Sequence, residues 1–311
     1  MKQVKMAYFQ LGLSMSFVGA NVAVGKLIVE DVPIFLFSEI RFLIALLFLV
    51  PMLFVNRQQT FRLHHKQWGL LFLQSFFGVF LFSILILYGV KFTSATSAGI
   101  ITSTVPAVIG LLSFFLLRDR LTFFQILSVC LAVLGISIIT FKEANPDGTA
   151  DFALLGNLLV LGSVVAESLF TILAKKLSGI LTPIQMATGV NIFGFLLFLP
   201  FAIKDWFSFN LSLMDFTTWS LIVYYSITAS VLSFVLWYRG VEKVRASVAG
   251  LFTGFMPVAA AIVGIFILKE PLGWTQVIGI ICVILAIFLG TKKSVQPPLE
   301  KKVGGSMRNP K

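Results

Sequence analysis

Charged residues are scarce in this sequence. Asp, Glu, Lys and Arg make up 12% of its 311 residues, whereas soluble domains usually contain about 25%. Stretches that contain none of these residues include 92–117, 121–141, 177–203, 246–268 and 271–291. An apolar run of about 18 residues or more can cross the hydrocarbon core of a bilayer as a helix. The shortage of charge therefore excludes an ordinary soluble domain and indicates an all-α polytopic membrane protein.

Cysteine and histidine are equally rare, with two of each. Cys130 and Cys282 fall in apolar runs, which favours buried packing thiols over a disulfide or a metal site. His64 and His65 lie together in a loop, so neither an H-E-x-x-H cluster nor a Ser–His pair can form at membrane depth. We therefore expect no catalytic residue, no metal and no cofactor, and a protein that is not an enzyme.

Ten apolar spans can be placed along the chain. Pro33, Pro183 and Pro271 lie at or just before the starts of three spans, where the missing N–H of proline costs nothing. The expected spans are 7–29, 33–54, 68–90, 95–117, 121–141, 152–174, 183–203, 217–238, 246–268 and 272–290. The connections between them are too short to contain an extramembrane domain.

Basic residues are unevenly distributed over the connections. The N-terminus, the tail from 291 and alternate loops hold 18 of the 24 Lys and Arg, whereas the opposite loops hold five of them and eight acidic residues. Lys and Arg accumulate on the cytoplasmic side of membrane proteins. We therefore expect both termini in the cytoplasm. The net charge of +11 follows from this topology and does not indicate a nucleic-acid partner.

The second half of the sequence repeats the first. A shift of 151 residues aligns "GVKFTSATSAGIITSTVPAVIGLLSFFLLRDRLTFFQ" (89–125) with "GVEKVRASVAGLFTGFMPVAAAIVGIFILKEPLGWTQ" (240–276). A unit of five spans places the second copy upside down relative to the first. Inverted repeats form many transporters, with the substrate site between the repeats near the bilayer midplane. The pattern therefore predicts a transporter that opens one site alternately to each side.

The repeat also predicts the domain organisation. We expect a first repeat over residues 1–143 and a second over 144–291, each with five helices. Residues 292–311 are polar and basic and contain Pro and Gly, which predicts a disordered cytoplasmic tail.

The segment "SFVGANVAVGKLIVEDVPIFLFSEIRFLIALLFLVP" (16–51) resembles the first helices of the EamA-type transporters of the drug/metabolite transporter superfamily. Val18 replaces the usual Trp, and the matching residues are Gly19, Asn21, Lys26, Pro33 and Arg41. The paired segments "SAGI…P…LRDRLT" and "VAGL…P…LKEPLG" are similar to helices 4 and 9 of that family. The resemblance covers nearly the whole chain. It implies a ten-helix transporter that exports small metabolites, often amino acids or amphipathic drugs, across a bacterial inner membrane.

Arg41 lies eight residues past Pro33, about 12 Å below the outer boundary of the membrane. An Arg near the centre of a spanning helix costs roughly 2.5–3.5 kcal/mol, so it should face a polar interior and have a partner. Asn21 lies at a similar depth and could meet it. We favour a clamp on backbone carbonyls that holds the first two helices together; an anchor for a substrate carboxylate is the alternative.

Two carboxylic acids are candidates for proton coupling. Glu39 is two residues from Arg41 and therefore on another face of the helix, from which it could reach Lys26. Glu167 lies past the midplane with no cation within one helical turn, so it could titrate during transport. The alternative for Glu167 is a neutral, hydrogen-bonded acid or a partner of Arg41 across the cavity.

The mid-helix prolines Pro106 and Pro257 could act as hinges. The residues that we expect along the substrate pathway are Asn21, Arg41, Gln74, Thr102, Pro106, Glu167, Asn191, Thr253 and Pro257. The expected partners are a small-molecule substrate and membrane lipids, and the protein is expected to be a monomer or a homodimer. An importer, a nucleotide-sugar-type antiporter, a membrane scaffold and an intramembrane enzyme are the alternative functions.

Overall fold

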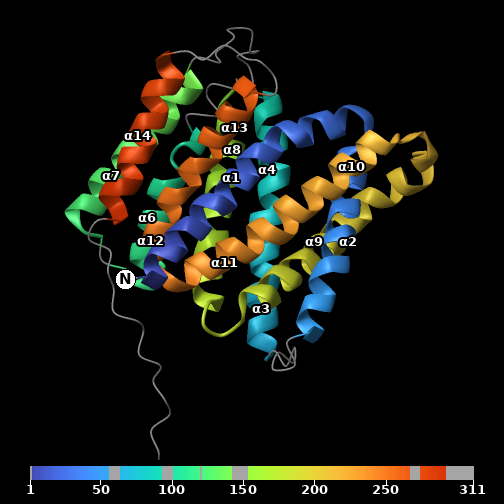
Figure 1. Ribbon diagram of the computed structural model, residues 1–311, viewed down its shortest axis with the longest axis horizontal. Coiled ribbons are helices and arrows are strands. Elements are labelled where there is room, and N and C mark those ends of the chain that lie inside the picture. The colour runs from blue at the N-terminus through green and yellow to red at the C-terminus, as the bar shows by residue number, and fades with distance from the viewer. Residues whose placement is uncertain are drawn as a thin grey trace, which may run out of the picture.

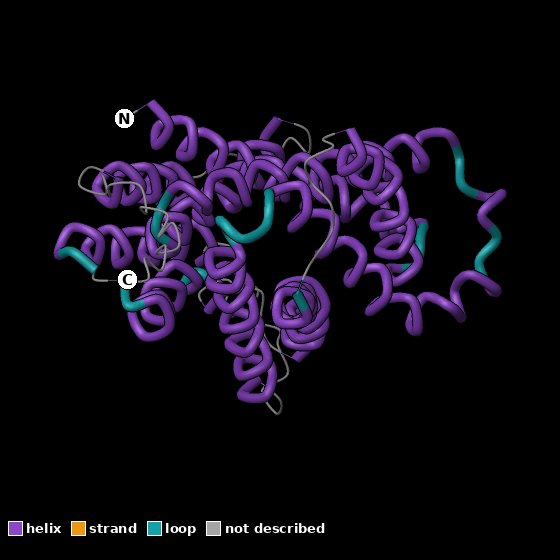
Figure 2. The backbone as a smooth tube through the Cα atoms, turned by 90° about the horizontal axis from the view of Figure 1, so that it is seen from below, coloured by secondary structure: helices purple, strands orange, loops and turns teal. Residues whose placement is uncertain are grey.

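The computed structural model describes residues 2–55, 64–92, 101–119, 121–141, 153–266 and 274–291, and these ranges are almost entirely helical (Figures 1 and 2). Six stretches are long and apolar enough to cross a membrane: Lys2–Asp31, Ile34–Phe54, His65–Gly89, Leu154–Leu177, Pro183–Ser208 and Phe216–Lys243. Shorter apolar helices cover Val105–Leu117, Phe123–Leu134, Ala246–Ala260 and Val277–Leu289. The prediction of an all-helical, polytopic membrane protein is confirmed.

Several spans consist of consecutive helical segments. In chain order the segments are α1 (Lys2–Asp31), α2 (Ile34–Val55), α3 (His65–Ser75), η1 (Phe76–Leu81), α4 (Phe82–Phe92), α6 (Val105–Leu117), α7 (Phe123–Phe141), α8 (Ala153–Leu177), α9 (Pro183–Ser208), η3 (Leu211–Leu213), α10 (Phe216–Tyr225), η4 (Ser226–Leu232), α11 (Ser233–Lys243), α12 (Ala246–Leu251), η5 (Phe252–Gly254), α13 (Phe255–Phe266) and α14 (Trp274–Thr291). The sequence sets some starts directly. Thr182 and Gln185 form a capping box before α9, and the Asp215 side chain accepts a hydrogen bond from the Thr218 N–H at the start of α10.

Both halves of the chain contain the same irregularities. The third helical rod of the first half is interrupted by the π-helical segment η1, and the corresponding rod of the second half contains the π-helical segment η4 about 150 residues later. Each half also has a proline inside its second helix, Pro51 in α2 and Pro200 in α9. π-Helical turns are rare and are often found at functional sites, so their recurrence indicates that the repeat extends to local geometry.

Pro106 and Pro257 do not lie in the middle of continuous helices, contrary to the prediction. Pro106 is in the first turn of α6, after a turn at Ser103–Thr104, and Pro257 follows the 3-10 segment η5 near the start of α13. A proline in the first helical turn needs no N–H partner. The break in each helix therefore comes before the proline, and the hinge role stays a prediction.

Helix packing follows the same internal symmetry. The pairs α2–α9 and α7–α14 each join corresponding helices of the two halves, and α7 and α14 lie side by side at one edge of the bundle (Figure 1). In the first half α1 packs against α11 and α13, and in the second half its counterpart α8 packs against α4 and α6. The core is thus built from reciprocal contacts between the halves, as expected for a repeat protein whose site lies between the repeats.

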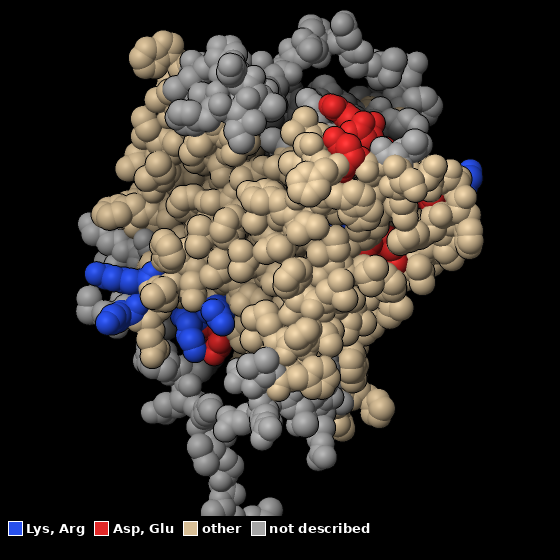
Figure 3. Space-filling view, turned by 45° about the vertical axis from the view of Figure 1, so that its right-hand side comes forward, with Lys and Arg blue, Asp and Glu red and all other residues tan. Residues whose placement is uncertain are grey.

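Most basic residues gather at one end of the bundle and most acidic residues at the other (Figure 3). At the end where α1 begins, which we call the basic end, the described basic residues are Lys2, Lys5, Lys66, Arg118, Lys175, Lys176, Arg239, Lys243 and Arg245. At the opposite or acidic end, the described acidic residues are Glu30, Asp31, Asp205 and Asp215. Leu11 of α1 packs on Gly240, near the end of α11, which shows that the start of α1 lies at the same end of the bundle as the end of α11.

Cys130 and Cys282 are free thiols, as expected, but Cys130 is exposed on the surface of the isolated chain and is therefore not a buried packing residue.

Close helix contacts depend on glycine, and Gly19 is the sharpest case. A Cβ at this position of α1 would overlap the carbonyl oxygen of Met256 on α13 and lie 2.9 Å from the Ala259 Cβ. Gly19→Ala should therefore force α1 and α13 apart and lower stability by about 1–3 kcal/mol, measured as a lower melting temperature in detergent. Gly69→Ala is the matched control because a Cβ at Gly69 meets nothing within 4 Å. Equal melting temperatures for the two variants would contradict the close contact.

Candidate functional site

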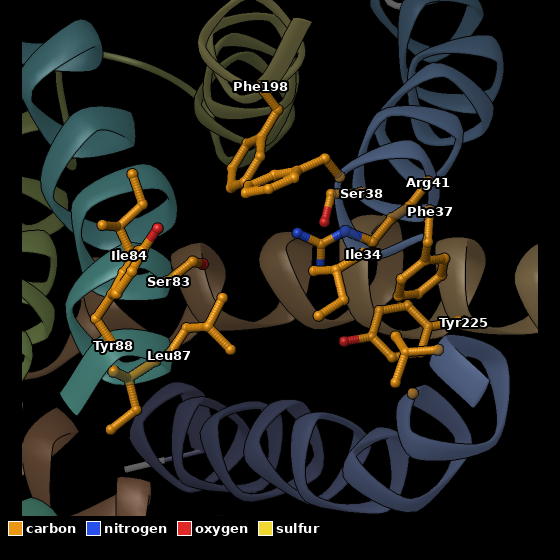
Figure 4. A pocket seen from close by; sticks show the side chains of 14 residues that line it. Ile34, Phe37, Ser38, Arg41, Ser83, Ile84, Leu87, Tyr88, Phe198 and Tyr225 are labelled. Atoms are coloured by element: carbon orange, nitrogen blue, oxygen red, sulfur yellow. The ribbon is translucent and has the colours of Figure 1, made fainter. Parts of the chain in front are cut away.

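A cavity of about 400 Å³ lies in the half of the bundle nearest the acidic end (Figure 4). Its walls come from the last turns of α1, the first turns of α2 and α4, and single residues of α9 and α10. The lining residues are Gly25, Val29, Ile34, Phe35, Phe37, Ser38, Arg41, Ser83, Ile84, Ile86, Leu87, Tyr88, Phe198 and Tyr225. The lining is largely apolar and aromatic, with few polar groups, which is typical of small-molecule sites.

Arg41 supplies the one charged side chain of this lining. Its guanidinium carbon lies 4.3 Å from the ring centroid of Phe42 and 5.6 Å from that of Tyr225. Its Nε is buried, and no described residue accepts a hydrogen bond from the guanidinium. Figure 4 shows the group extending from α2 into the cavity towards α4. The described residues therefore contain no carbonyl clamp for Arg41, and the guanidinium is free to bind a ligand.

Cation–π contacts contribute about 0.5–2 kcal/mol each. The rings of Phe42 and Tyr225 together can therefore offset much of the roughly 2.5–3.5 kcal/mol that an Arg costs near the centre of a spanning helix. A ring face does not accept the in-plane hydrogen bonds of the guanidinium, so its N–H groups can still bind a substrate carboxylate or phosphate.

Asn21 and Glu39 do not contribute to the cavity. The Asn21 side chain donates to Thr228 Oγ1 and to the Phe17 carbonyl, each at 2.8 Å, and does not meet Arg41. Glu39 is fully buried, and neither of its carboxyl oxygens accepts a hydrogen bond from the described residues. Glu39 forms no ion pair with Arg41 in the described part of the chain. The proposed contact with Lys26 lies outside the described residues, because the Lys26 side chain is not among them.

The other expected pathway residues are distributed over the bundle and do not form one site. Gln74 and Asn191 are fully buried and hydrogen-bonded, the former to the Tyr238 hydroxyl at 3.2 Å and the latter to the Ser230 carbonyl at 3.1 Å. Thr253 of η5 donates to the Gly250 carbonyl of the preceding segment α12, and Thr102 lies just before the turn that precedes α6. Of this set the cavity contains Arg41 alone.

Glu167 lies on α8, away from the cavity lining and from Arg41. Its side chain is half-buried, and no described residue forms a hydrogen bond or ion pair with it. The pairing with Arg41 that we considered is therefore absent from the described structure.

The repeat counterpart of this cavity is closed. At the offset of 150 residues that relates η1 to η4, Tyr88 and Leu87 of the cavity, which are 50% and 41% exposed, correspond to Tyr238 and Trp237, which are 1% and 2% exposed. Arg41 corresponds to Asn191, since each lies eight residues after a proline at its helix start. The helices α9 and α11 pack directly on each other, whereas their counterparts α2 and α4 form opposite walls of the cavity. One end of the bundle is therefore open and the other closed.

Specific contacts hold the closed end together. Tyr238 accepts a hydrogen bond from Gln74 and stacks on Phe234, with ring centroids 6.1 Å apart. The Lys175 ammonium of α8 donates to the carbonyl oxygens of Val241 and Glu242 at the end of α11, at 2.9 and 3.2 Å. We call this set of contacts, made by Gln74, Lys175, Phe234 and Tyr238, the basic-end closure.

Comparison with known proteins agrees with this architecture. The sequence profile described as the EamA-like transporter family matches the chain twice, over residues 5–141 and 154–291. The chain belongs to the EamA-like transporter family. The expected family resemblance is thereby confirmed, and the protein is a multi-pass membrane transporter. The predicted repeat boundary at 143/144 and the tail 292–311 lie outside the described residues.

Relatives of this EamA protein include "Uncharacterized transporter YetK" of Bacillus subtilis (strain 168), which is 46% identical over 292 residues, or 94% of this chain and 88% of that protein. An "Uncharacterized transporter" of Archaeoglobus fulgidus is 26% identical over 284 residues, or 91% of this chain and 98% of that protein. A solved crystal structure at 16% identity has a TM-score of 0.76 and covers 91% of this chain and 96% of its own, which shows a shared fold.

The sequence did not reveal most of the cavity. The residues that line it without being among the expected pathway residues include Phe37, Ser38, Ser83, Tyr88 and Tyr225. One signal was available. Tyr88 and Tyr238 are 150 residues apart, the offset that also relates η1 to η4, so the pair marks the same place in both halves.

Proposed function

We propose that this transporter works by alternating access and exports small organic anions that also carry an apolar or aromatic group. The observation that supports this best is the pairing of an open cavity around an unpaired Arg41 with a closed counterpart at the other end. Two halves with opposite orientation can exchange these conformations, so that the site opens first to one side and then to the other.

The cavity supports this substrate class. Its volume of about 400 Å³ is at the lower end of the range of about 300–1,000 Å³ for small-molecule sites. Arg41 can bind a carboxylate in a bidentate manner, the rings of Phe37, Phe198 and Tyr225 can pack on an apolar group, and Ser38 and Ser83 offer hydroxyl groups. A small molecule of about the size of an amino acid, with a carboxylate and an apolar group, can make all of these contacts.

The proposed topology has ten spans with both termini in the cytoplasm of a bacterial cell. The basic end of the bundle then faces inward and the acidic end outward, in agreement with the positive-inside rule. In this orientation the open cavity faces the outside.

The proposal is tested by flux into proteoliposomes that contain the purified chain. A panel of labelled amino acids and other carboxylates is compared with isosteric amides and with organic cations of the same size. We expect uptake and counterflow for apolar carboxylates and at least tenfold less for the amides. Equal flux for carboxylates and amides would contradict the substrate class, and a lack of flux for the whole panel would contradict the transport proposal.

Proton coupling through Glu167 is a separate prediction. A half-buried carboxyl group without a fixed partner can bind and release a proton as the bundle changes conformation. Glu167→Gln should therefore remove the pH dependence of transport between about pH 5 and 8 while leaving counterflow active, measured as initial rates in proteoliposomes. Glu39→Gln is the comparison because Glu39 also lies on a spanning helix, where it is fully buried. An unchanged pH profile for Glu167→Gln would leave Glu167 as a structural acid.

A further inference from the structure

A second hollow lies at the basic end, far from the cavity. It has a volume of about 440 Å³ and is formed by one face of the first turns of α1 and one face of the last turn of α11. Its lining consists of Lys2, Gln3, Met6, Gln10, Arg239, Glu242 and Lys243. We call it the basic groove. Residues four apart lie on the same face of a helix, so the two sets of side chains face one another across the groove.

The groove carries an excess of positive charge. Lys243 pairs with Glu242 at 2.7 Å, the one ion pair in the described part of the chain. Lys2 and Arg239 consequently have no carboxylate partner there. Two cations that share a groove repel one another, and an anion between them removes this repulsion. An arginine beside a lysine suits a phosphate oxygen pair in particular.

The groove also borders the lipid-facing surface. Met6, in its lining, is 54% exposed, and Phe9, one turn further along α1, is 64% exposed. In a spanning helix such side chains contact acyl chains, whereas Lys2 at the helix start lies at the level of the lipid head groups. The cationic side chains of the groove thus lie at the level of the lipid head groups, and the apolar side chains of Met6 and Phe9 lie at the level of the acyl chains.

From this arrangement we propose that the basic groove is a binding site for an anionic phospholipid of the cytoplasmic leaflet. Arg239 and Lys2 bind the phosphate, Gln3 and Gln10 offer amide groups to the glycerol or head-group oxygens, and Met6 and Phe9 contact an acyl chain. Basic pockets on the cytoplasmic side of membrane helices are suited to such head groups. The proposal does not depend on the substrate or the direction of transport.

The test uses the full chain in detergent with phosphatidylglycerol or phosphatidylcholine of identical acyl chains, and native mass spectrometry counts the retained lipids. We expect at least tenfold tighter binding of phosphatidylglycerol. The double variant Lys2→Gln/Arg239→Gln should lose that preference, with about a fivefold weaker affinity for each charge removed. The control Lys66→Gln/Lys176→Gln removes two charges from the same end outside the groove and should change affinity by less than twofold.

Three results would overturn the proposal. Equal affinity for the two lipids would show that the groove does not recognise an anionic head group. An equal loss of affinity in the control variant would show that the lipid is attracted by the total charge of this end and not by the groove. Full displacement of the lipid by millimolar inorganic phosphate would assign the groove to a soluble anion. The single variants Lys2→Gln and Arg239→Gln give the same readout if the double variant does not fold.

Discussion

Arg41→Gln should lower the flux of small organic anions by about 10- to 100-fold. The guanidinium is the one charge in the cavity lining, and no described residue takes up its hydrogen bonds. A hydrogen bond to a charged group contributes about 1.5–3 kcal/mol, and each 1.4 kcal/mol is a factor of ten in affinity. The loss should appear mainly as a higher KM for the carboxylate, measured by initial rates in proteoliposomes.

Two controls separate anchoring from a structural role. Arg41→Lys keeps the charge but not the planar fork, so it should retain part of the flux. Because Arg41 has no hydrogen bond to the described protein, Arg41→Gln should keep the melting temperature of the parent or raise it slightly. A melting temperature many degrees lower, with flux lost in proportion to the folded protein, would restore the clamp that the sequence favoured.

The contrast between the spans and the cavity shows what a sequence can predict here. Each charge-free run marks a helix because the hydrocarbon core acts on every residue locally, and the expected span 183–203 lies within α9 (Pro183–Ser208). The burial of Arg41 was predictable for the same reason. Its neighbours were not, since Tyr225 comes from α10 and reaches Arg41 only through the packing of distant helices.

Asn21 illustrates the same limit. Its depth in α1 equals that of Arg41 in α2, which suggested a contact, but depth does not fix the direction of a side chain. Asn21 faces η4 and binds Thr228. The π-helical segments η1 and η4 were also invisible in the sequence. An extra residue in a helical turn costs stability that tertiary contacts must offset, and no local motif marks it.

The sequence also did not indicate which end of the bundle is closed. The repeat predicts equivalent sites at the two ends and does not predict which of them is open. Thr188 of α9 is fully buried, whereas its counterpart Ser38 of α2 lines the cavity. We attribute the difference to the basic-end closure, in which Lys175 binds two carbonyl oxygens at the end of α11. Such charged hydrogen bonds contribute about 1.5–3 kcal/mol, which is enough to bias two conformations of otherwise similar energy.

Lys175→Ala should therefore shift the transporter towards the state that is open at the basic end. The change is read by single cysteines at Thr188 and Ser38 in a background with Cys130→Ser and Cys282→Ser, using a membrane-impermeant maleimide on oriented vesicles. With Lys175 intact, the cysteine at 38 should react and the cysteine at 188 should be at least tenfold slower. In Lys175→Ala we expect labelling at 188 to rise about tenfold or more and labelling at 38 to fall, since a population shift must be reciprocal.

Lys176→Ala is the matched control because Lys176 is the exposed neighbour on the same helix. It removes the same charge from the same end but none of the contacts of the basic-end closure, and both labelling rates should stay within twofold. A rise at both reporter positions in Lys175→Ala would indicate general loosening of the bundle, and an unchanged rate at 188 would show that Lys175 does not hold the end closed. A reciprocal change would show that the contact of α8 with the end of α11 controls which end of the bundle is open.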